Sequence, residues 1–182
     1  MIDLQKKISR NFRWAEVVAS ETATRNGIDN IPPETLFPEI TRHAETMELV
    51  REMLNQKFAE RNNVMREDVN VPITISSWYR SPALERVICG QSYERWAISA
   101  GGGVNEQSWK TYLAAKSHPK GTATDFNARM FGPPREVFEA IRESDIQFDE
   151  LIIEFDSWVH MSSAVNPRMS AFGINNSGRY QV

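Results

Sequence analysis

The chain has 182 residues, of which 41% are hydrophobic and 25% charged, and its formal net charge is -3. This length and composition predict an ordinary globular domain and disfavour a disordered or fibrous chain. Because Lys and Arg form no block and the charge is not basic, nucleic acid is not an expected partner. No apolar run approaches the ~18–20 residues that cross a bilayer, so no membrane span is expected.

Helices are expected to dominate the first part of the chain, with short ones near 14–19 and 20–26. After the break at Ile31-Pro32-Pro33, apolar residues at helical spacing predict a long helix over about 34–60. His43 falls in this helix. Since no cysteine or carboxylate shares an obvious face with it, His43 is expected to have a surface or packing role.

Short strands are expected later in the chain. Residues 71–79 alternate and are rich in β-branched and aromatic side chains, which is typical of a strand. Further strands are expected at 121–128, 151–155 and 158–162, with a turn at Asp156-Ser157 between the last two.

The remaining segments include short helices at 83–88, 106–115 and 134–143, a flexible loop at the triple glycine 101–103 and a polar tail over 164–182. Helices that lead and strands that follow predict an α+β domain with a small antiparallel sheet and flanking helices. We expect one domain over 1–182, with a helical part to about 65 and a core over about 70–163.

Two of the three histidines lie in distinctive surroundings. His118 precedes a turn with Gly121, and the chain then enters a strand in which Asp125 and Ala123 point to one face. Asp125 can therefore meet His118, while His160 can arrive from a neighbouring strand. Two imidazoles and one carboxylate, with a fourth position open, are typical of a catalytic zinc. The alternative from the residues alone is a structural hydrogen-bonded pair between His118 and Asp125.

Separated segments of the chain resemble peptidase family M15, the zinc D-alanyl-D-alanine carboxypeptidases, dipeptidases and phage endolysin peptidases that share a fold with the Hedgehog signalling domain. The likeness runs from about residue 8 to 163, and its segments keep the order of the family. They are Ile8-Ser9-Arg10-Asn11-Phe12, Gly27-Ile28-Asp29-Asn30 with Pro32-Pro33, Ser77-Trp78-Tyr79-Arg80-Ser81-Pro82-Ala83-Leu84, Ser117-His118 with Gly121, Ala123 and Asp125, and Trp158-Val159-His160.

The resemblance implies a role for each matching position. His118, Asp125 and His160 match the zinc ligands. Arg80 matches an arginine that supports the substrate and the developing oxyanion, and the alternative is a solvated turn arginine. Ser117 matches a residue that bonds the substrate's terminal carboxylate, and the alternative is a local backbone cap.

The general base is where the sequence departs from the family. Many members carry a carboxylate three residues before the last histidine, but Ser157 stands there. Glu154 and Asp156 are the candidates, and Glu154 is favoured because similar chains ending in Trp-Val-His carry Glu at its place. A turn at residues 156–157 would be required to bring Glu154 near His160. The alternative for Glu154 is a strand-edge or hydrogen-bonding carboxylate.

Residues 91–116 form a second departure, since relatives pass more quickly from the arginine segment to the histidine segment. This stretch is expected to be either a surface loop with its own aromatic cluster or a wall that alters substrate choice. Cys89, the single cysteine, is expected to be a small buried residue, with a catalytic nucleophile as the alternative.

The resemblance implies a zinc-dependent peptidase that hydrolyses an amide bond in peptidoglycan stem or bridge peptides. The first residues lack the apolar core and cleavage site of a secretory signal. We therefore expect a protein made in the cytoplasm, which reaches the cell wall by phage-type release or as part of a virion. The alternative is a non-catalytic wall-binding or virion structural protein that keeps the fold.

Overall fold

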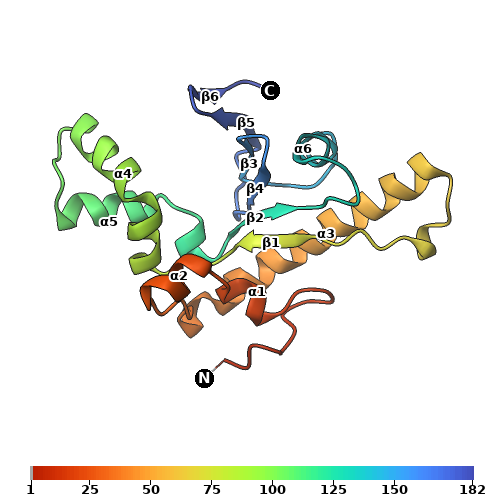
Figure 1. The fold of residues 1–182 in the computed structure, drawn as a ribbon, viewed down its shortest axis with the longest axis horizontal. Helices are drawn as coiled ribbons and strands as arrows, with labels where there is room; N and C mark the ends of the chain where they lie inside the picture. Colours follow the sequence, from red (N-terminus) through yellow and green to blue (C-terminus); the bar gives the residue numbers. More distant parts are fainter. Residues whose placement is uncertain (1) are drawn as a thin grey trace.

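The computed structural model describes residues 2–182 and has the α+β architecture that the sequence predicts. An open sheet of six strands stands at the centre, and helices flank it (Figure 1). None of the helices within residues 2–182 has the length and apolar content needed to cross a membrane. The helices are α1 (Trp14–Val18), α2 (Glu21–Asn26), α3 (Phe37–Asn62), α4 (Pro82–Ser99), α5 (Glu106–Ala114) and α6 (Pro134–Arg142), with short 3-10 turns η1 (Glu34–Leu36), η2 (Arg66–Asp68) and η3 (His118–Lys120).

The sheet is mixed, with the strand order β1-β2-β4-β3-β5-β6. All neighbouring strands are antiparallel except β3 and β5, which run parallel. The prediction of a small antiparallel sheet is therefore wrong in this respect. The strands are β1 (Thr74–Ser77), β2 (Ala123–Asn127), β3 (Glu150–Glu154), β4 (Trp158–Ser162), β5 (Ser170–Asn175) and β6 (Gly178–Tyr180).

The C-terminal segment is part of this sheet, so the prediction of a polar tail over 164–182 is wrong. Strand β5 pairs with β3 along its length, and β6 returns beside β5. Phe172 is buried in β5, and Ala171 beside it packs against the main core. Gly178, with φ of 106°, permits the tight turn that joins the two strands.

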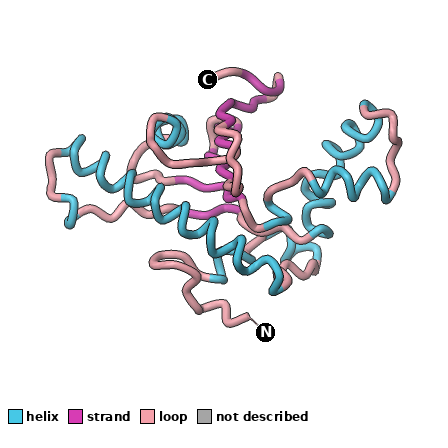
Figure 2. The backbone as a smooth tube through the Cα atoms, turned by 180° about the vertical axis from the view of Figure 1, so that it is seen from behind, coloured by secondary structure: helices cyan, strands magenta, loops and turns pink. Residues whose placement is uncertain are grey.

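The central strands have one face in the main core and one face toward a cleft. Phe126, Ile153 and Val159 belong to the core that α3 and α6 cover. Figure 2 shows α3 crossing the back of the sheet. Because side chains alternate along a strand, Asp125 and His160, their neighbours in β2 and β4, point to the opposite face.

Residues 82–114 form a helical hairpin, the α4–α5 arm, which projects to one side of the sheet (Figure 1). Tyr93, Ala97, Trp109 and Tyr112 are buried between its two helices as a second, smaller core. The predicted aromatic cluster is confirmed. The short helix predicted at 83–88 is wrong in extent, because packing against this cluster carries α4 through Gly90 to Ser99.

Candidate metal centre

His118 is held by a turn that only glycine can complete. The chain forms η3 and then reverses at Gly121, where φ is 72°. A Cβ atom at Gly121 would lie 2.3 Å from Cγ1 of Ile40. A larger residue would therefore clash with Ile40, and it would also be strained by the left-handed backbone conformation. Nδ1 of His118 lies 2.6 Å from the carbonyl oxygen of Trp78. An Nδ1–H that donates to this carbonyl leaves the Nε2 lone pair free for a metal ion.

Asp125 and His160 face each other across the β2–β4 pair. They are direct register partners, which places their side chains on the same face of the sheet. Oδ1 of Asp125 lies 2.8 Å from Nδ1 of His160 and 3.2 Å from Nε2 of His118. The structure thus brings together the three ligands that the sequence predicts.

The three ligand atoms fit a single ion. Those of His118, Asp125 and His160 all lie within 4.8 Å of one another, and each residue is buried. Zinc bonds of about 2.0–2.1 Å at tetrahedral angles would place ligand atoms roughly 3.3 Å apart. Two imidazole nitrogens and one carboxylate oxygen are a donor set that zinc accepts, and they leave the fourth position to a water molecule or a substrate.

The protonation of the cluster follows from this contact. Burial alone would raise the pKa of Asp125, but the charges and hydrogen bonds of His118 and His160 hold it well below 3.8. Burial lowers the pKa of His118 below 6.5 against the opposing effect of Asp125. Burial would also lower the pKa of His160, but the hydrogen bond and charge of Asp125 raise it. Asp125 is therefore an anion ready to bind a cation.

Arg80 anchors the second oxygen of Asp125. Its Nη2 atom pairs with Oδ2 of Asp125, while Nε donates to Oγ of Ser77 over 2.8 Å. Nη1 lies 3.6 Å from Oε2 of Glu85, and the Arg80 side chain is only 13% exposed. The interpretation of Arg80 as a solvated turn arginine is therefore wrong. Its guanidinium orients the metal-binding carboxylate from behind, as an outer partner of a metal ligand does.

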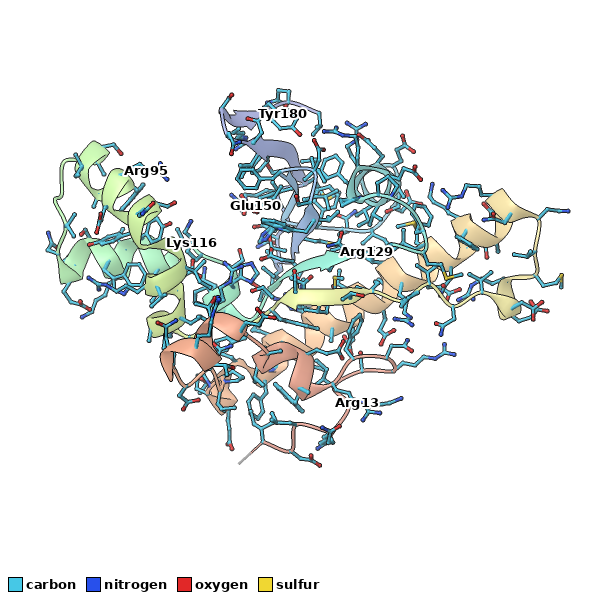
Figure 3. The ribbon with its side chains drawn as sticks, viewed as in Figure 1. Arg13, Arg95, Lys116, Arg129, Glu150 and Tyr180 are labelled. Atoms are coloured by element: carbon cyan, nitrogen blue, oxygen red, sulfur yellow. The ribbon has the colours of Figure 1, made fainter. Side chains whose placement is uncertain are left out.

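A cleft of about 570 Å³ opens over the metal-binding face of the sheet. The sheet forms one wall, and the α4–α5 arm with the segment that follows it forms the other. Lys116 on the arm side and Glu150 on β3 both line the cleft, and Figure 3 shows them on its two sides. Residues 91–116 thus supply a wall of the cleft, and their predicted effect on substrate choice stays a prediction.

Glu154 is the candidate base that reaches the cleft. It ends β3 opposite Trp158, two residues along from the pair of Ile152 with His160, so it shares the face of His160. Burial and the charge of Asp125 raise the pKa of Glu154 above 4.5.

Asp156 and Ser157 lie outside the cleft lining. Oδ1 of Asp156 pairs at 2.9 Å with Nη2 of Arg135 on α6, away from the metal-binding residues. The predicted turn at residues 156–157 is present. It places Glu154 and His160 on the neighbouring strands β3 and β4, so the two residues are not held apart at the ends of one continuous strand.

Ser117 and Cys89 also line the cleft. The Ser117 side chain makes no cap hydrogen bond to the η3 turn, which removes the backbone-cap alternative. Cys89 is half-buried, and burial together with Glu85 raises the pKa of its thiol to about 12. A thiol with this pKa is protonated at neutral pH, which disfavours the nucleophile alternative.

His43 has the packing role that the sequence predicts. It is fully buried, with Nδ1 2.9 Å from Oγ of Ser163 and Nε2 3.3 Å from Oγ1 of Thr124. Its ring packs edge-on against Trp78, whose carbonyl holds His118. His43 therefore supports the centre from the core side of the sheet.

Sequence reasoning missed Glu85 and the carbonyl of Trp78. Glu85 is 1% exposed, and its Oε2 atom has no hydrogen-bond partner in the described structure. A carboxylate one turn into the helix after Arg80 was the available signal. No sequence signal marks a backbone carbonyl as the partner of a metal ligand.

Comparison with known proteins adds no relative. No protein-family model, no curated protein and no solved structure matches this chain.

Proposed function

We propose that the chain is a zinc-dependent peptidase that hydrolyses an amide bond in peptidoglycan stem or bridge peptides. One observation carries the proposal: His118, Asp125 and His160 converge on one face of the sheet, and Glu154 shares that face in the same cleft. A three-ligand site beside a free carboxylate is the arrangement that metal-assisted hydrolysis needs.

Each group in the cleft has a chemical task. When bound, zinc would act as a Lewis acid on the scissile carbonyl and would activate a water molecule. Glu154 accepts the proton of the attacking water and passes it to the leaving amine, and its raised pKa suits both steps. Arg80 keeps Asp125 in its metal-binding orientation, and its positive charge near the cleft favours the developing oxyanion.

The peptidoglycan substrate and the finer fold assignment rest on the sequence resemblance. The segments that resemble peptidase family M15 contribute Arg80, Ser117 and all three candidate ligands to the cleft. We extend the proposal to the Hedgehog/D-Ala-D-Ala carboxypeptidase type of fold and to a phage or prophage protein that acts on the wall after release or within a virion. Ser117 has a free side chain at the cleft and would bond a terminal carboxylate of the substrate.

Digestion of purified peptidoglycan, followed by mass analysis of the fragments, tests the proposal. The zinc-loaded protein should release fragments with new amino and carboxyl ends at one kind of amide bond, and Glu154→Gln should not. Intact peptidoglycan after incubation with a protein that has bound zinc would overturn the proposal. That result would favour the alternative of a non-catalytic wall-binding or virion structural protein.

A further inference from the structure

Strand β1 is an edge strand with a hollow along its free side. It pairs with β2 on one side only, and within residues 2–182 no other strand pairs with it. An unpaired strand edge presents backbone N–H and C=O groups that can accept another extended chain. On its free side lies a cavity of about 900 Å³, larger than the cleft over the metal centre.

The cavity lies between two parts of the fold, and its walls combine hydroxyl groups with apolar surface. On one side are Ile75, Ser76 and Ser77 of β1, and on the other are α2 and the residue before it, Ser20. The α2 wall contributes Glu21, Thr22, Thr24 and Arg25. Hydroxyl groups and an exposed strand edge fit a peptide backbone better than they fit an apolar ligand.

The cavity adjoins the metal-site cleft. Arg80 and Ile88 line both hollows, so the two meet at the Ser77 end of β1. Ser77 is the register partner of Asp125, and its hydroxyl accepts from Nε of Arg80. A chain that leaves the edge of β1 at Ser77 therefore passes Arg80 and enters the cleft beside the metal ligands.

We propose that this cavity is a substrate-binding groove in which an extended peptide adds to the free edge of β1, so that the substrate is a long wall peptide that extends well beyond the cut bond on one side. The inference deepens the proposed function and rests on it. Backbone hydrogen bonds to β1 supply affinity, while the α2 wall contacts alternate side chains of the peptide.

The spacing sets the length of substrate that benefits. Adjacent strands lie about 4.8 Å apart, so a peptide on the edge of β1 runs roughly 10 Å from β2, which carries Asp125. At about 3.3 Å per residue, three residues cover that distance. The groove therefore acts only on substrates that extend beyond the scissile bond by more than about three residues on one side.

The test uses peptides of graded length around the bond that the peptidoglycan digestion identifies, extended separately on each side. We expect kcat/KM of the zinc-loaded protein to rise on the order of tenfold when one side passes three residues, which is the effect of one or two backbone hydrogen bonds. Thr24→Trp fills the groove and should abolish this gain.

Thr111→Trp is the matched control. Thr24 and Thr111 both lie exposed on helices and donate to the carbonyl four residues earlier, but Thr111 lines neither hollow. This variant should keep the full gain. A second measurement is amide hydrogen exchange in Thr74–Ser77 of zinc-loaded Glu154→Gln, which the long peptide should slow and the short peptide should not.

The outcomes separate the two proposals. Three results would overturn the groove but not the peptidase proposal. They are cleavage that does not depend on peptide length, an equal gain in the two Trp variants, and unchanged amide exchange in β1. Failure to cut any peptide with zinc bound would overturn the proposed function, and the groove as a substrate site with it.

Discussion

Asp125 and His160 are direct partners across the β2–β4 pair, with 2.8 Å between Oδ1 of the carboxylate and Nδ1 of the imidazole. The contact joins residues 35 apart in the sequence across two central strands of the sheet. His118 approaches the same oxygen from the η3 turn. Oδ1 of Asp125 is therefore within hydrogen-bond distance of both imidazoles. The register of the sheet thus holds the three side chains of the candidate site together.

Asp125→Asn should remove zinc binding. An amide carries no charge to bind the cation, so we expect the zinc dissociation constant to rise by more than about 100-fold, beyond the 10–100-fold effect of outer partners. Competition with a chromophoric chelator measures this. Asp156→Asn makes the same chemical change at the exposed turn and should bind zinc as the parent does. Equal zinc affinity in the two variants would contradict the assigned site.

Glu154→Gln should abolish catalysis and leave zinc in place. A lost general base typically costs about 10²–10⁴-fold in rate. Asp156→Asn should keep parental kcat, because Asp156 pairs with Arg135 and does not line the cleft. Steady-state rates on a wall peptide that contains the cut bond check this, with the zinc content measured in each sample. Loss of rate in Asp156→Asn alone would reverse the assignment.

Arg80→Lys should weaken zinc binding even though the charge is kept. The guanidinium contacts Asp125, Ser77 and Glu85 from separate nitrogens, and a single ammonium cannot do so. We expect a loss of about tenfold in zinc affinity, as for other outer partners. If kcat falls while zinc affinity stays parental, Arg80 acts on the substrate alone and does not position Asp125.

Zinc affinity should increase with pH until His160 has lost its proton. In the metal-free protein Asp125 raises the pKa of His160 above 6.5, so below that raised pKa zinc must displace a proton. His118 has a lowered pKa and does not compete in this range. We expect about a tenfold gain per pH unit that levels off only above pH 6.5. Levelling below 6.5 in a zinc titration across pH would contradict the assigned protonation.

His43 should make the metal-free fold sensitive to acid. Its pKa falls from 6.5 to about 3 because it is fully buried, so the unfolded chain binds more protons between these values. This contribution to stability is complete above pH 6.5 and is lost as pH falls toward 3. Between about pH 7 and pH 4.5, the free energy of unfolding of His43→Gln should therefore fall by about 2–3 kcal/mol less than that of the parent. Parallel urea-unfolding curves for the two proteins would contradict this.

The sequence allowed prediction of the elements whose patterns are local. The apolar residues at helical spacing in α3 and the apolar, β-branched run of β3 specify helix and strand without further context. Strand β5 was missed because polar residues precede and follow it and its order comes from pairing with β3. The length of α4 was missed because packing on Trp109 and Tyr112 outweighs the cost of Gly90.

The candidate site shows the same division. His118, Asp125 and His160 could be grouped from residue type, a turn and strand alternation. The contacts of Arg80 with Asp125 and of His118 with the Trp78 carbonyl depend on how β1 lies against β2, which no local pattern specifies. The groove beside β1 likewise follows from strand order and was not predicted.

X-ray absorption at the zinc edge of the protein loaded with one equivalent tests the central claim most directly. We expect two imidazole nitrogens at about 2.0–2.1 Å, oxygen donors at about 2.0–2.2 Å and no sulfur. These signals should be absent from Asp125→Asn at the same loading. A sulfur scatterer at about 2.3 Å, which Cys89 would supply, or a first shell with fewer than two imidazoles would contradict the account.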